Sequence, residues 1–117
     1  MAAQPYSFEE TSRTLDGPQG RLHYHEVGEG KPLVLLHGSG PGVSGWANFQ
    51  GNLPLFARHF RCLVLDMPGF GDSEPPASGH PMLDAPAAVM RFCDALGIRE
   101  AFFVGNSMGG GVTASVA

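Results

Sequence analysis

The sequence predicts an α/β fold in which helices cover both faces of a mostly parallel β-sheet. Three short and mainly apolar runs, at residues 33–36, 61–66 and 101–104, have the length of buried strands, and each run leads into a glycine-rich turn. Helical patterns lie between these runs. Strands that alternate with helices along the chain are typical of parallel sheets with helices on both sides.

The chain opens with a predicted β-hairpin. Residues 8–27 contain two strand candidates separated by Asp16-Gly17-Pro18, which is a turn pattern. His23 and His25 alternate onto one face of the second candidate and could form a metal pair. No third ligand is evident, so a solvated strand face is the favoured interpretation.

Two helical regions follow the first and second apolar runs. The first contains apolar side chains at near-helical spacing, namely Trp46, Phe49, Leu53 and Phe56. Gly51 and Pro54 are expected to break this region into two short pieces. The second helix is predicted to start at Asp84 as N-cap, to hold Pro86 in its first turn and to stop at Gly97.

The third apolar run leads into Gly105-Asn106-Ser107-Met108-Gly109-Gly110, which has the Gly-x-Ser-x-Gly pattern of a nucleophile elbow. Such a turn from strand to helix is strained, and its two outer positions crowd unless they lack a Cβ. The turn would expose the Ser107 hydroxyl, and the Met108 N–H would face an oxyanion beside it. An ordinary glycine-rich loop is the alternative, which the preceding strand disfavours.

The first apolar run leads into a second glycine-rich loop, His37-Gly38-Ser39-Gly40-Pro41-Gly42. The loop lacks the Lys-Ser/Thr pair of a P-loop and the spacing of a dinucleotide fingerprint, which disfavours phosphate binding. It is better interpreted as an oxyanion loop that brings the Ser39 N–H opposite that of Met108. His37 would then shape the loop and would not be the catalytic base.

A third motif, Asp66-Met67-Pro68-Gly69-Phe70-Gly71-Asp72-Ser73, follows the second apolar run. Together the three motifs resemble the α/β-hydrolase superfamily. Within it, the His37 loop, the following Trp46-Ala47-Asn48 and the Ser107 turn resemble the meta-cleavage product hydrolases. Those enzymes hydrolyse a carbon–carbon bond in the ring-opened dienoates of aromatic degradation, with water and without a metal or organic cofactor.

This resemblance implies roles for seven residues. Ser107 is the implied catalytic nucleophile, the backbone N–H groups of Ser39 and Met108 form the oxyanion hole, and the implied substrate-binding residues are Gly38, Gly40, Asn48 and Asn106. An amide side chain before the nucleophile can bind a carboxylate or enol without adding charge. As an alternative, Asn48 could simply cap or stabilise the helix that follows the loop.

The catalytic acid and histidine that would assist Ser107 are expected outside this sequence. In this fold the chain order is serine, acid, histidine, yet all five histidines precede Ser107 and only ten residues follow it. Residues 1–117 are therefore expected to be the N-terminal part of a single α/β-hydrolase domain, truncated just after the elbow and lacking the lid and C-terminal strands. The strand at residues 101–104 would then form an exposed apolar edge.

Three functional hypotheses follow. The first is a serine-dependent carbon–carbon hydrolase acting, when complete, on 2-hydroxy-6-oxo-dienoate-type products. The second is a carboxylesterase or related acyl hydrolase, which shares the serine machinery, and the third is an inactive fragment without the acid and histidine. Dehalogenases and epoxide hydrolases are disfavoured because they carry Asp at the position of Ser107.

Composition adds exclusions. The net charge is −4, and the seven Lys and Arg residues are scattered along the chain. This distribution predicts that the protein binds neither nucleic acid nor an acidic membrane surface. No secretory signal or membrane-length apolar run is evident, and Cys62 and Cys93 are interpreted as reduced core residues. A cytoplasmic protein that acts on a small molecule and water is expected, with a homo-oligomer of the complete protein left open.

Overall fold

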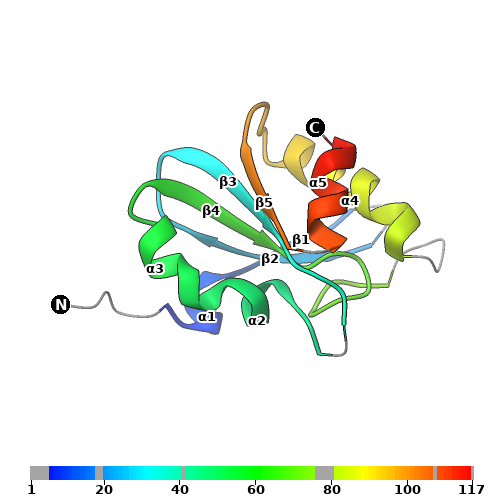
Figure 1. Cartoon of the computed structure of the whole chain (residues 1–117), viewed down its shortest axis with the longest axis horizontal. Helices are drawn as coiled ribbons and strands as arrows, with labels where there is room; N and C mark the ends of the chain where they lie inside the picture. The colour runs from blue at the N-terminus through cyan, green and yellow to red at the C-terminus, as the bar shows by residue number, and fades with distance from the viewer. Residues whose placement is uncertain (1–5, 18–19, 41, 76–80, 107, 117) are drawn as a thin grey trace.

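The fold is built on one five-stranded sheet, seen in a computed structural model that describes residues 6–17, 20–40, 42–75, 81–106 and 108–116 (Figure 1). The strands are β1 (Ser12–Leu15), β2 (Leu22–Val27), β3 (Lys31–Leu36), β4 (Phe60–Leu65) and β5 (Phe102–Gly105). Their order across the sheet is β1-β2-β4-β3-β5. β3 pairs in parallel with β4 and β5, whereas β1 and β2 form the predicted antiparallel hairpin and β2 pairs antiparallel with β4.

Helices cover both faces of this sheet, as predicted. They are α1 (Phe8–Thr11), α2 (Gly45–Phe49), α3 (Leu53–Phe56), α4 (Pro81–Ala95) and α5 (Met108–Val116), and a 3₁₀ turn, η1 (Gln50–Asn52), joins α2 to α3. Figure 1 shows α2 and α3 on one side of the sheet and α4 and α5 on the other. The expected break near Gly51 and Pro54 is confirmed. None of these helices is long and apolar enough to cross a bilayer, in the part of the chain that is described.

The central strand β3 divides its side chains between two hydrophobic cores. Val34 and Leu36 pack with α4 and α5, whereas Leu33 and Leu35 pack with α2 and α3. Three of these four side chains are fully buried and Leu33 is nearly so. Complete burial of one such side chain contributes roughly 1.5–3 kcal/mol, so β3 is anchored from both sides. A strand held in this way gives the loops at its ends a firm base.

Two elements near the surface differ from the sequence prediction. Residues 8–11 form a helical turn, because the side chains of Ser7 and Glu10 each bond the other's backbone N–H in a capping box. The later helix begins at Pro81, three residues before the predicted N-cap Asp84, so Pro86 lies inside it. The fixed φ of proline suits the first helical position, which explains the earlier start.

The prediction of a solvated face for His23 and His25 is wrong. The two side chains are 2% and 0% exposed, respectively. Phe8 and Trp46 cover them, with ring centroids 4.6 and 4.7 Å from that of His25. The sequence pattern located the histidines correctly on one face of β2. It did not reveal that α1 and α2 would close over that face.

The outer strand β5 is the exposed edge that the sequence predicted. Among the described strands it pairs with β3 alone. Phe102 is 53% exposed and Val104 is 38% exposed, although both belong to the apolar run. An edge strand presents unpaired backbone groups that can template further strand pairing.

The buried His25 should make stability depend on pH. Its Nδ1 lies 2.8 Å from Thr11 Oγ1, and its buried Nε2 has no hydrogen-bond partner among the described residues. Burial, aided by the nearby His23, lowers the pKa of His25 from 6.5 to about 4. The unfolded chain therefore binds this proton more readily between pH 6.5 and 4. Stability is fully present above that window and falls by up to about 3 kcal/mol across it.

We expect the His25→Phe variant to lack this component while keeping an aromatic ring between Phe8 and Trp46. Thr11 Oγ1 would keep a partner, because it also lies 3.0 Å from the Ser7 carbonyl oxygen. The measurement is the free energy of unfolding by urea at several pH values for both proteins. Parallel curves between pH 6.5 and 4 would contradict the assignment.

Candidate active site

The candidate site is formed where β3 and β5 end side by side. Leu36 is paired with Gly105, and the Asn106 N–H donates a 3.0 Å hydrogen bond to the Leu36 carbonyl. The His37 loop and the Ser107 turn therefore leave the sheet next to each other. In open α/β sheets, ligands bind outside the carboxyl ends of the strands, which is this edge.

Glycine is required on both sides of the turn. A Cβ added to Gly105 would lie under 3.0 Å from the Gly109 carbonyl, and one added to Gly109 would lie under 3.0 Å from the Leu36 carbonyl. Backbone atoms at such distances cannot yield as a flexible side chain would. The turn is thus packed against its own helix and against β3, as the elbow pattern predicted. Ser107 itself lies outside the described residues, so the position of its hydroxyl remains a prediction.

Asn48 joins the two loops. Its Oδ1 accepts one hydrogen bond of 3.0 Å from the Gly38 N–H and another of 3.1 Å from Asn106 Nδ2. The helix cap is a different residue, because Ser44 Oγ accepts the Ala47 N–H at 3.0 Å. The alternative that Asn48 is a helix cap is therefore wrong. Three predicted site residues, Gly38, Asn48 and Asn106, meet in one hydrogen-bonded group.

His37 supports the loop from below. The side chain is 0% exposed, and both ring nitrogens have backbone partners. Nδ1 donates to the Gly38 carbonyl at 2.6 Å, and Nε2 accepts the Met67 N–H at 2.9 Å. Burial lowers the pKa of His37, which favours the neutral ring that this pattern needs. The geometry agrees with a residue that shapes the loop and has no free nitrogen to act as a base.

Asp66 organises the third motif. Its carboxylate accepts hydrogen bonds from the backbone N–H groups of Gly45 and Asp72 at 2.7 and 3.1 Å. It also accepts one from His23 Nδ1 at 2.7 Å, and its carbonyl accepts one from Ser73 Oγ at 2.6 Å. The motif was predicted from the sequence, but the hydrogen bond between His23 and Asp66 was not. A buried carboxylate needs several donors, and an inward-facing histidine on the neighbouring strand was the available signal.

The remaining predicted positions lie around this group. Ser39 and Gly40 are exposed in the loop, and Met108 is the first residue of α5. Their joint role in an oxyanion hole remains a prediction. Within the described ranges, no group of three or more His, Cys, Asp or Glu side chains is arranged to hold a metal ion.

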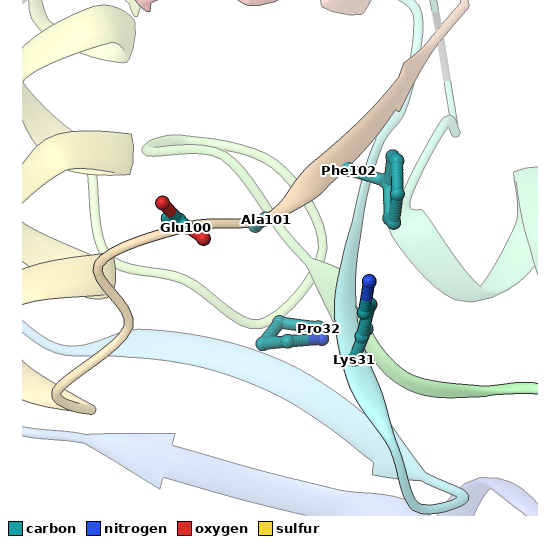
Figure 2. Close-up of a pocket in the computed structure, with 5 residues that line it drawn as sticks. All are labelled: Lys31, Pro32, Glu100, Ala101 and Phe102. Carbon is teal, nitrogen blue, oxygen red and sulfur yellow. The ribbon is translucent and has the colours of Figure 1, made fainter.

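A separate pocket of about 300 Å³ lies at the opposite edge of the sheet (Figure 2). It is formed at the amino ends of β3 and β5, and its lining residues are Lys31, Pro32, Glu100, Ala101 and Phe102. Because parallel strands place these residues a full strand length from Asn106, this pocket is not part of the candidate site.

Comparison with known proteins adds independent findings. The family described as alpha/beta hydrolase fold matches residues 31–117. The chain is 48% identical to a 2-hydroxy-6-oxononadienedioate/2-hydroxy-6-oxononatrienedioate hydrolase of Paraburkholderia phymatum, over 80% of this chain and 34% of the relative. A hydrolase of the same description from Klebsiella pneumoniae is 41% identical, over 94% of this chain and 41% of the relative. The chain thus spans well under half the length of these relatives.

The chain is also similar to solved structures of hydrolases. A mutant of the meta-cleavage product hydrolase CumD from Pseudomonas fluorescens IP01, in complex with acetates, is 35% identical with a TM-score of 0.85, over 93% of this chain and 40% of that one. The N-acyl homoserine lactonase AidH, as a mutant with N-hexanoyl homoserine, is 28% identical with a TM-score of 0.78, over 90% of this chain and 39% of that one.

The close packing at the elbow predicts opposite effects for two kinds of Gly→Ala change. Gly105→Ala and Gly109→Ala force backbone atoms apart and should each lower the free energy of unfolding by roughly 1–3 kcal/mol. Gly111→Ala is the matched control, since an added Cβ there meets no atom within 4 Å. It should stabilise the helix by up to about 1 kcal/mol. Denaturant unfolding measures all three, and equal effects would contradict the packing argument.

Proposed function

The chain belongs to the α/β hydrolase fold family, and from this premise we propose that Ser107 is the nucleophile of a serine-dependent hydrolase. We propose further that the complete protein hydrolyses a carbon–carbon bond in 2-hydroxy-6-oxo-dienoate-type compounds. The observation that carries the proposal is the bonding of Asn48 to both Gly38 and Asn106 beside the elbow. The similarity to dienedioate hydrolases supports the substrate class.

The Asn48–Asn106 pair suits a dienoate because it offers neutral donors. Asn48 Oδ1 already accepts two hydrogen bonds. The Asn48 side chain can therefore bind a substrate through the two N–H groups of Nδ2. Asn106 Nδ2 uses one N–H on Asn48 and carries a second. An anionic carboxylate or enolate accepts such bonds, and they position it without a fixed charge that would hold the product.

The proposed reaction uses the rest of the edge. The dienol substrate is ketonised, and Ser107 Oγ attacks the keto carbon next to the bond to be cleaved while its proton passes to the proposed histidine. The carbon–carbon bond then breaks, the dienol fragment leaves as a stabilised anion that takes up this proton, and water hydrolyses the acyl group from Ser107. The Ser39 and Met108 N–H groups stabilise the oxyanion, each worth on the order of 3 kcal/mol. Water is the co-substrate and no metal or organic cofactor is needed. Because the chain spans only 34% and 41% of the two dienedioate hydrolases it resembles, we propose that the acid and histidine lie in the part of the complete protein that these 117 residues do not cover.

An acyl hydrolase is the second candidate. The similarity to an N-acyl homoserine lactonase favours it, because that protein is 28% identical to this chain with a TM-score of 0.78. The two candidates share Ser107 and the oxyanion hole and differ in the part of the pocket that meets the substrate. Under either candidate function, the 117-residue chain alone should not catalyse hydrolysis through Ser107.

The proposed location is the cytoplasm. Cys62 and Cys93 are free thiols, 0% and 8% exposed, and they lie in different cores. Buried, unpaired cysteines are typical of a reducing compartment, which supports this proposal.

Asn106→Asp tests the substrate class in the complete protein. A carboxylate at this position repels the dienoate end, so kcat/KM for a dienoate should fall by on the order of a hundredfold. kcat/KM for a neutral aryl ester should change only a few-fold. The assays are loss of dienoate absorbance and release of a phenol.

Two variants serve as controls for this test. Asn52→Asp places the same charge on exposed η1 and should leave both reactions unchanged. Ser107→Ala should abolish both. Equal losses on both substrates in Asn106→Asp would overturn the dienoate role and favour the acyl hydrolase.

A further inference from the structure

A second serine lies in a Ser–His–Asp arrangement far from the elbow. Ser12 Oγ is 2.5 Å from His23 Nε2, and His23 Nδ1 is 2.7 Å from Asp66 Oδ2. The three residues come from β1, β2 and the end of β4, so the sheet pairing itself brings them together. Nucleophile, base and orienting carboxylate at such distances are the geometric signature of an activated hydroxyl.

The hydrogen bonds around Asp66 fix which nitrogen carries the proton. The carboxylate already accepts the N–H groups of Gly45 and Asp72, and a carboxylate has no proton to donate. His23 Nδ1 must therefore be the donor to Asp66. In the neutral ring Nε2 is then the acceptor, and it faces the Ser12 hydroxyl. This tautomer allows His23 to remove the serine proton.

The base is also held rigidly. The His23 side chain is buried, and its ring stacks on Phe8 at 5.4 Å between centroids. Its backbone N–H donates to Ser73 Oγ at 2.8 Å, which ties it to the third motif. Because the ring cannot turn freely, little reorganisation is needed when it accepts a proton.

Solvent reaches Ser12 through a hollow. Ser12 is partly exposed at the start of β1, and with His23 it lines a depression of about 750 Å³. The charged side chains that line this depression are Asp16, Arg21, Asp72 and Glu74. Three carboxylates against one guanidinium favour a ligand with a positive charge.

This arrangement is separated in space from the elbow. In the sheet order, β2 and β5 are three strand spacings apart, which is about 14 Å. His23 at the start of β2 therefore cannot serve Ser107, which follows β5. The hydrogen bonds of His23 are made instead to Ser12, Asp66 and Ser73.

We propose that Ser12, His23 and Asp66 form a second nucleophilic site that accepts the acyl group of a cationic ester. A bond forms from Ser12 Oγ to the ester carbonyl carbon as the hydroxyl proton moves to His23 Nε2. The ester C–O bond then breaks, and the leaving alkoxide takes that proton. The products are acyl-Ser12 and a free alcohol, and Asp66 stabilises the transient imidazolium.

The test is labelling of the full-length protein with a fluorophosphonate that bears a quaternary ammonium group. Serine attack forms an O–P bond and expels fluoride. Trypsin cleavage after Arg13, Arg21, Arg58 and Arg99 places Ser12 on peptide 1–13, Ser39 and Ser44 on peptide 22–58, and Ser107 on the peptide that starts at Glu100. Fragment mass spectra separate Ser12 from Ser7.

We expect Ser12 to be labelled on the order of a hundredfold faster than Ser39 and Ser44, which lack an imidazole partner among the described contacts. His23→Asn keeps an N–H for Asp66 but removes the base, so it should abolish this advantage. Ser12→Ala should remove the label from peptide 1–13.

The comparison with Ser39 and Ser44 is internal to the unmodified protein, so it holds even if His23→Asn does not fold. Labelling of Ser12 no faster than of those serines would overturn the proposal and leave a purely structural network. Labelling of Ser107 alone would also overturn it, while supporting the proposed function.

Discussion

The parallel pairing of β3 with β4 and β5 is the constraint on which the rest of the structure depends. β3 lies between the other two, and its side chains enter both cores. The three strands consequently end at one edge, where all three sequence motifs begin. Loops whose residues are far apart in the chain become neighbours only because Leu36 is in register with both Leu65 and Gly105.

Buried polar groups complete this edge. His37 and Asp66 would be costly to bury alone, yet each has partners for its polar atoms, some within its own motif and some in another segment of the chain. The His37 loop is tied to the turn after β4, and that turn is tied to β2. Within the described residues, hydrogen bonds between buried polar groups hold this edge together.

Much of this arrangement could be predicted because local rules carried it. The apolar runs predicted the positions of β3, β4 and β5, and the glycine spacing predicted the elbow at Gly105 and Gly109. Burial of His23 and His25 could not be predicted, since it depends on α1 and Trp46 folding over β2 from elsewhere in the chain. The capping box of Ser7 and Glu10 was readable from the sequence and was missed. The link from Asn48 to Gly38 is a tertiary contact that no local pattern specifies.

The shared oxygen of Asn48 has a consequence for how this edge can change in evolution. One acceptor serves a loop amide on one side and the Asn106 side chain on the other. A substitution that moves either donor alters the hydrogen bond of the other, so effects at Gly38 and Asn106 should be strongly non-additive. The two loops thus behave as one inherited unit: a lineage that remodels one of them must pass through a compensating change in the other.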